Sequence, residues 1–245
     1  MVAVEAGCLC FYLLTCGTDS MLKTIQSRLR LRTKIRKSAT RGEEELLLIQ
    51  HLLSSGTAID IGANKGIYSL VMSRYADRVI AVEPNVDLKS DLDVLPANCE
   101  LVFCAVGEQN SQAVFYIPLT EKGKNRPNIG SLIQMEDQRV EKREVEVRTL
   151  DDIAADVDDI QLVKIDVEGA EIGVLKGAPE VLRKHRPTLI VECLSDEAQE
   201  EISEYLLEFG YIPFRCVGHR LQHNSQVKNA RHRTVDRNVI YFPAA

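Results

Sequence analysis

Short apolar runs rich in β-branched residues alternate with amphipathic stretches over most of this 245-residue chain. Near-continuous apolar runs predict strands buried on both faces, and helices between such strands predict a parallel sheet covered on both sides. The pattern therefore indicates a doubly wound α/β fold, in a chain long enough for one core of ordinary size. The expected strands are 57–61, 78–83, 100–106, 162–167, 188–193, 211–217 and 238–242.

Helical patterns fill the spaces between these runs, and an earlier one begins at Glu43, with acids in its first turn and Gly56 as its stop. Between 113 and 151, two strand-like runs flank a polar stretch, which predicts a β-hairpin insertion whose loop covers substrate. We expect a basic leader over 1–42 and one domain over 43–245. The other helical patterns cover about 66–76, 86–95, 171–184 and 196–209.

A glycine-containing motif, AIDIGANKGIYSL, follows the first strand and carries Asp60, Gly62, Asn64 and Gly66. In open α/β sheets, ligands bind at this junction, where glycines permit a tight turn and a close backbone approach. A dinucleotide site would have the spacing GxGxxG, whereas this motif reads DxGxNxG. An acid in the turn suits a ligand with a cationic amino group, such as S-adenosylmethionine. A tight turn without a ligand is the alternative interpretation.

The ends of the next two strands extend this predicted cofactor site. Glu83 ends the second strand, 17 residues beyond Gly66, where a carboxylate can accept hydrogen bonds from ribose hydroxyls. Cys104 and Ala105, with Val106 after them, are expected to line an adenine slot. The spacing of Glu83 favours the ligand-binding interpretation of the glycine motif over the plain turn.

A second acidic motif, LVKIDVEGAEIGVLKGAPEVL, follows the fourth strand. Asp166 and Glu168 lie at the strand end, Glu171 begins the next helix, and Lys164 precedes Asp166 by two residues. This sheet edge faces the same crevice as Asp60, so the three acids are predicted to supply a general base or to hold a divalent cation such as magnesium. The alternatives are favourable charge at a helix N-terminus and a buried Lys164–Asp166 pair.

Charge is unevenly distributed along the chain. Residues 1–41 carry a formal charge of +6 and the remainder −12, for a total of −6. An acidic body argues against extended nucleic-acid binding, but the run RLRLRTKIRK is compatible with peripheral contact to an anionic membrane as well as with a solvated leader. Glu5 interrupts an apolar stretch that is already shorter than the roughly 20 residues of a membrane-spanning helix, so no span is predicted.

The cysteines indicate a reducing compartment, which we expect to be the cytoplasm. There are seven of them, an odd number with no CxxC pair, and most lie within apolar runs. That arrangement is a poor disulfide framework and a poor zinc site, since buried cysteine commonly behaves as a small hydrophobic residue.

An ordered set of motifs resembles the FkbM-type methyltransferases, a branch of the class I S-adenosylmethionine-dependent enzymes. The resemblance extends from about Glu43 to Pro243 and implies a seven-stranded sheet whose last strand is antiparallel. It also implies methyl transfer, mostly to hydroxyls of sugars, glycolipids or polyketides. The motifs are DIGANKGIYSL, VIAVEP, AVG, NIGSL, VRTLDDI, VKIDVEGAEIGVLKGAPEVL, RPTLIVE and NVIYFP.

The resemblance also assigns roles to residues by position. It makes Asp60, Gly62, Asn64 and Glu83 the cofactor set. Asp166, Glu168 and Glu171 match the family's acidic signature, and Ser131 in NIGSL matches a further position, which we expect to contact substrate. We expect an in-line displacement in which Asp166 or Glu168 accepts the proton of the substrate hydroxyl, with Lys164 as a further member of the catalytic set.

Two other function classes remain at this point. A nicotinamide-dependent oxidoreductase also uses a strand–glycine–helix unit and a ribose-binding acid, but the chain lacks GxGxxG. A binding module on an inactive methyltransferase fold would not need the intact set from Asp60 to Glu83. His219 and His223 lie four residues apart in a polar stretch, and we expect His219 to contact substrate rather than a metal.

Overall fold

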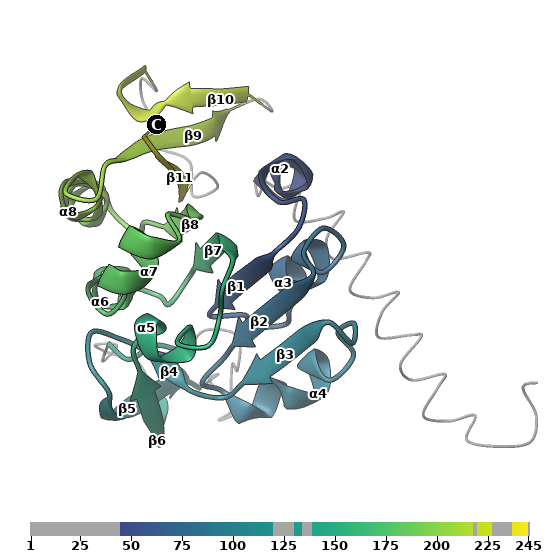
Figure 1. Ribbon diagram of the computed structural model, residues 1–245. Coiled ribbons are helices and arrows are strands. Elements are labelled where there is room, and N and C mark those ends of the chain that lie inside the picture. The colour runs from purple at the N-terminus through teal and green to yellow at the C-terminus, as the bar shows by residue number, and fades with distance from the viewer. Residues whose placement is uncertain (1–44, 120–129, 134–138, 218–219, 227–236, 245) are drawn as a thin grey trace, which may run out of the picture.

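The computed structural model describes residues 45–119, 130–133, 139–217, 220–226 and 237–244 (Figure 1). The helices of this part of the chain are α2 (Glu45–Leu52), α3 (Ile67–Met72), η1 (Val86–Leu88), α4 (Lys89–Leu92), α5 (Leu150–Ile153), α6 (Glu171–Lys176), α7 (Pro179–Lys184), α8 (Asp196–Leu207) and η2 (Asn224–Gln226). The strands are β1 (Thr57–Ile61), β2 (Arg78–Val82), β3 (Cys99–Val102), β4 (Ala105–Val106), β5 (Ser111–Pro118), β6 (Val140–Arg148), β7 (Ile160–Ile165), β8 (Thr188–Glu192), β9 (Tyr211–Val217), β10 (Arg220–His223) and β11 (Asn238–Pro243).

The main sheet confirms the predicted doubly wound α/β class. Its order is β10-β9-β11-β8-β7-β1-β2-β3, and the pairs from β8 to β3 are all parallel. Strand β11 is antiparallel to both of its neighbours, β8 and β9. The sheet has one strand more than the seven that the family resemblance implies, because β10 folds back on β9 as an antiparallel edge.

Each face of the sheet is covered by its own helices, as Figure 1 shows. Alternate residues of the central strands, such as Ala58 and Leu162, pack under α2 and α3. Their neighbours, such as Ile59 and Val163, pack under α6, α7 and α8. All five residues of β1 are buried, which explains why the central strands appear in the sequence as near-continuous apolar runs.

Two predicted elements are subdivided in the structure, and the predicted hairpin gains a third strand. The run 100–106 forms β3 and β4, which belong to different sheets, because β4 pairs with β6. The predicted hairpin forms as β5 and β6, which pair antiparallel over Ser111–Pro118 and complete a small second sheet with β4. The helix predicted over 171–184 is two helices, because Gly177 packs against the backbone of Gly107 and Pro179 starts α7.

Several predictions fall wholly or partly outside the described residues. These are the leader over 1–42, the start of the domain at 43, most of the loop between β5 and β6, His219, and most of the polar stretch after β10. Within the described residues, none of the helices is long and apolar enough to cross a membrane.

Candidate functional site

The turn after β1 is shaped by two residues in the left-handed region. Gly62 has a φ of 77°, and a Cβ at this position would lie 1.8 Å from the carbonyl oxygen of Asp166. Asn64 follows with a φ of 50°, a conformation that asparagine tolerates better than most residues. The Asp166 amide donates to the carbonyl of Ile61 over 3.0 Å, so the turns after β1 and β7 are in direct contact. Glycine is therefore required at 62 by both conformation and space.

Asp60 lies behind this turn and not in the cleft. Its side chain is only 2% exposed, and Oδ2 accepts hydrogen bonds from the backbone N–H (2.8 Å) and the hydroxyl of Ser69 in α3. Burial raises the pKa of Asp60, although the bonds from Ser69 and the charge of Lys164 oppose that rise. The structure thus shows Asp60 fixing α3 to β1, a contact that the sequence pattern does not reveal. Gly66, the N-cap of α3 with a φ of 73°, packs against Leu95 and likewise lies outside the cleft lining.

Glu83 stands at the end of β2 and holds two loops together. Its Oε2 accepts from the Asn64 amide and its Oε1 from the Asn85 amide, each over 2.8 Å. The side chain is buried, and burial raises its pKa to about 7 despite the two backbone hydrogen bonds that favour the carboxylate. Each carboxylate oxygen has a second lone pair, so Glu83 can still accept hydrogen bonds from a ligand.

A cleft opens at the carboxyl ends of β1, β2 and β7, with about 630 Å³ of space that is partly open to solvent. The predicted residues Gly62, Asn64 and Glu83 line it on one side, and Asp166 and Glu168 line it on another. Its apolar surface includes Val82, Cys104, Ala105, Val106 and Phe115.

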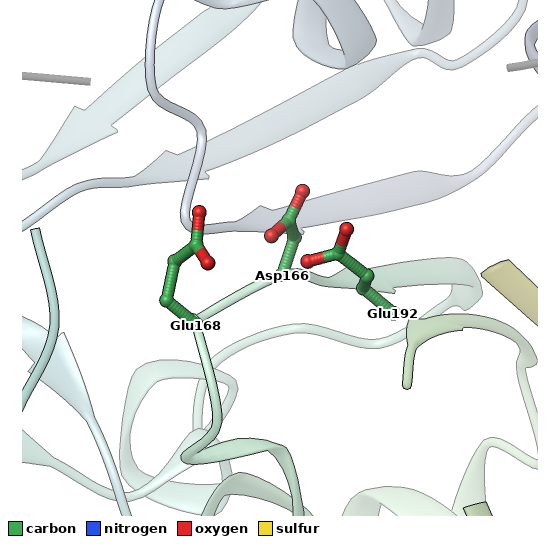
Figure 2. Close-up of side chains that lie close together, drawn as sticks. All are labelled: Asp166, Glu168 and Glu192. Atoms are coloured by element: carbon green, nitrogen blue, oxygen red, sulfur yellow. The ribbon is translucent and has the colours of Figure 1, made fainter. Parts of the chain in front are cut away.

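Three carboxylates gather beside this cleft, as Figure 2 shows: Asp166 and Glu168 after β7, and Glu192 at the end of β8. One oxygen from each lies within 4.8 Å of the others. The second acidic motif predicts Asp166 and Glu168 here, whereas Glu192 was not predicted. The signal was present, because RPTLIVE ends in an acid at the same edge of the sheet, on the strand next to β7.

Among the described residues, Lys164 supplies the positive charge closest to this cluster. Its ammonium is buried, 3.3 Å from Asp166 Oδ2 and 5.0 Å from the centre of the Tyr68 ring. Burial disfavours the charged form of Lys164, but the surrounding carboxylates outweigh burial and raise its pKa. Burial likewise opposes ionisation of Asp166, yet Lys164 and a hydrogen bond with Glu192 hold the Asp166 pKa below its usual range. Lys164 and Asp166 are therefore an ion pair at neutral pH.

Glu192 carries the opposite shift. Burial raises its pKa to about 8, and the charge of Asp166 and the hydrogen bond between the two side chains add to the effect. Burial also raises the pKa of Glu168, with the charges of Asp166 and Glu171 acting in the same direction. Because like charges this close disfavour joint ionisation, Glu192 is the member of the pair that holds a proton near neutral pH, and Asp166 is the anion.

Glu171 does not lie among the clustered acids, where the sequence motif places it. Its Oε1 accepts from the amides of Gly169 (3.0 Å) and Val167 (3.2 Å), and the side chain is only 2% exposed. Burial raises its pKa. The Glu171 carboxylate thus closes the loop that carries Glu168, whose own φ of 53° is unusual for glutamate. Among the described residues, it is Glu192 rather than Glu171 that completes the acidic cluster.

The insertion contributes a short segment to this site. Ser131 Oγ donates to the carbonyl of Glu168 (2.9 Å) and accepts from the Ile133 amide (3.0 Å). Ser131 is buried, whereas Gly130 and Leu132 on either side of it line the cleft. His223 lies at the end of β10, where its ring contacts Phe214 edge-on. Its Nδ1 lies 2.7 Å from Ser225 Oγ.

Comparison with solved structures gives similar chains of low sequence identity. A Methylobacillus flagellatus FkbM methyltransferase is 18% identical, with a TM-score of 0.49, over 77% of this chain and 43% of that one. A precorrin 8W decarboxylase from Methanobacterium thermoautotrophicum is 16% identical, with a TM-score of 0.44, over 82% and 90% of the two chains. A Streptococcus mutans protein solved in complex with SAH is 12% identical, with a TM-score of 0.45, over 82% and 97%.

Comparison of the sequence with protein families is decisive for the assignment. No curated protein matches the chain. The family model of the methyltransferase FkbM domain matches residues 60–213, which include the turn after β1, Glu83, the acidic loop after β7 and Glu192. The match covers more than half of the sequence and ends within β9. The chain therefore belongs to the FkbM methyltransferase family.

Proposed function

We propose that the protein transfers the methyl group of S-adenosylmethionine to a hydroxyl of a sugar, glycolipid or polyketide-like small molecule. The observation that carries the proposal is the cleft at the ends of β1, β2 and β7, which combines a ribose-binding acid, an apolar slot and an acidic end in a member of this family. A cleft edged by carboxylates suits a cofactor that carries two cationic groups and no phosphate.

The residues of the cleft fit the parts of this cofactor. Glu83, at the end of β2, would accept hydrogen bonds from the ribose hydroxyls through its remaining lone pairs. Cys104, Ala105 and Phe115 provide apolar surface for the adenine. Gly62 lets the backbone of the β1 turn approach closely, and Asp166 and Glu168 place negative charge at the cationic end.

When bound, S-adenosylmethionine supplies a methyl group that is already activated by the sulfonium. The protein's task is to align the acceptor oxygen with that methyl group and to receive the proton that the hydroxyl loses. The carboxylates after β7 and β8 are the groups available for that proton. Lys164 keeps one of them, Asp166, ionised.

The cellular setting is part of the proposal. Three of the described cysteines, Cys99, Cys104 and Cys193, are free thiols. Free thiols within a domain are typical of a reducing compartment, and we place the reaction in the cytoplasm.

Isothermal titration calorimetry and a methyl-transfer screen test the function. The full chain is titrated with S-adenosylmethionine and, separately, with NAD. It is then incubated with methyl-labelled cofactor and a panel of methyl glycosides, with and without magnesium. We expect S-adenosylmethionine to bind, NAD not to bind, and label to reach a hydroxyl of at least one glycoside. Binding of NAD alone would favour the oxidoreductase, and binding of neither ligand would favour the binding module.

A further inference from the structure

The carboxyl group of Glu192 lies at the acidic end of the cleft, with an oxygen within 4.8 Å of oxygens of Asp166 and Glu168. Resting on the proposed methyl transfer, we propose that Glu192, rather than Asp166 or Glu168, is the general base that receives the proton of the acceptor hydroxyl. Asp166 is then a positioning residue, which acts through its contact with Glu192.

The order of the strands sets Glu192 apart from the cofactor cleft. The described lining residues include the ends of β1, β2 and β7 but no residue of β8. Strand β8 lies on the far side of β7 from β1. Two strands, β7 and β1, therefore lie between β8, which ends at Glu192, and β2, which precedes Glu83. The Glu192 carboxylate is nonetheless within 4.8 Å of the acidic end of the cleft. An acceptor that approaches from the β8 side would therefore reach Glu192 beside the reacting end of the cofactor.

The other two carboxylates are less suited to accept a proton. Asp166 is held as an anion by the Lys164 ammonium, 3.3 Å from its Oδ2, and a carboxylate stabilised in this way is a weak base. Glu168 lines the cleft itself, on a loop tied down by Ser131 and Glu171, where its charge faces the cofactor. The side chain of Glu192 is 18% exposed, enough for contact with an acceptor while remaining largely desolvated.

Charged groups on the described segments next to β8 influence the pKa of Glu192. From β7 and the loop after it, Asp166 and Glu168 raise the Glu192 pKa and Lys164 lowers it. From the segment before β11, Arg237 Nη1 approaches Glu192 Oε1 at 4.0 Å. Burial and Asp166 dominate, and the pKa rises to about 8. A base with a pKa near the working pH combines a usable ionised fraction with a strong affinity for the proton.

The proposed step balances without a further reactant. The acceptor oxygen forms a bond to the methyl carbon while the carbon–sulfur bond breaks, and its electron pair stays on sulfur. The hydroxyl proton passes to the Glu192 carboxylate and then to solvent. The products are a methyl ether, the neutral thioether and one proton.

The decisive variant is Glu192→Gln, compared with Glu192→Asp and with Glu204→Gln on the exposed face of α8 as the matched control. For any methyl glycoside that the wild-type protein methylates, kcat should rise about tenfold per pH unit and level off above about pH 8. Glu192→Gln should lower kcat about 100-fold or more and remove this inflection, with the Kd for S-adenosylmethionine unchanged. Glu192→Asp should keep the inflection, and Glu204→Gln should behave as wild type.

Infrared titration of the full chain provides a readout that needs no acceptor. The difference between the wild-type and Glu192→Gln spectra, which cancels the other buried carboxyls such as Glu83, should contain a protonated carboxyl band that disappears with a midpoint near pH 8. The inference is overturned if this difference spectrum contains no such band. It is also overturned if Glu192→Gln keeps kcat within threefold and retains the inflection. A wild-type protein that neither binds S-adenosylmethionine nor transfers methyl groups would instead refute the proposed function.

Discussion

At the scale of single residues, Gly62 is where the turns after β1 and β7 come closest. We predict that Gly62→Ala lowers the free energy of unfolding by about 3 kcal/mol, because the new methyl group would meet the Asp166 carbonyl and the φ of 77° disfavours alanine. Urea denaturation measures this loss. Gly173→Ala is the matched control, since its Cβ would meet nothing closer than 3.9 Å and α6 would gain helix propensity. Equal stability of the two variants would contradict this account of Gly62.

The raised pKa of Glu83 leads us to predict that cofactor binding depends on pH. Its pKa is raised to about 7, and its carboxylate form is the better acceptor for ribose hydroxyls. The ionised fraction therefore falls as the pH drops through 7, and binding should weaken in that direction. We expect the Kd for S-adenosylmethionine to be about tenfold higher at pH 6 than at pH 8, measured by calorimetry. Glu83→Gln should bind more weakly at pH 8 and show little change between the two pH values.

At the scale of elements, the loop between β7 and α6 depends on the Glu171 carboxylate. We predict that Glu171→Ala speeds hydrogen exchange at the amides of Val167 and Gly169 and destabilises the protein by about 2 kcal/mol, because two amides lose their acceptor. Glu171→Gln keeps one acceptor oxygen and should restore most of the protection. Glu180→Ala, also in the first turn of a helix but exposed, should leave these amides unchanged. Fast exchange in the Gln variant as well would indicate that the negative charge, and not the acceptor, orders the loop.

The same loop shows what the sequence pattern can and cannot predict. The apolar run before Asp166 and Glu168 predicts that these two acids follow a buried strand and lie at the cleft, as they do. Glu171 and Asp60 carry the same chemistry in the sequence, yet they accept bonds from backbone or serine groups inside the fold. Which acids face solvent is decided by packing between elements, and no periodicity encodes it. Glu192 could have been predicted from the sequence, because the carboxyl ends of adjacent parallel strands lie at one edge of the sheet.

At the scale of the whole molecule, α2 belongs to the core although it precedes the family match. Ile49 is fully buried and packs in the cluster that includes Ala58, Leu162 and Ile240. We predict that Ile49→Ala lowers the free energy of unfolding by about 3 kcal/mol, measured in urea. Leu47 lies two residues earlier in α2 and is 45% exposed, so Leu47→Ala should change the free energy of unfolding by less than about 0.5 kcal/mol. A small effect at Ile49 would mean that the domain begins after α2.

The position of β11 has a consequence for how the protein folds during synthesis on the ribosome. This strand comes last of the sheet strands along the chain, yet it lies between β8 and β9 and aligns Asn238 with Glu192. A nascent chain that has emerged only as far as β10 therefore has two strand edges, one on β8 and one on β9, that lack their β11 partner. These edges of β8 and β9 stay unpaired until residues 238–243 have left the exit tunnel, although the acidic cluster on β7 and β8 does not depend on them.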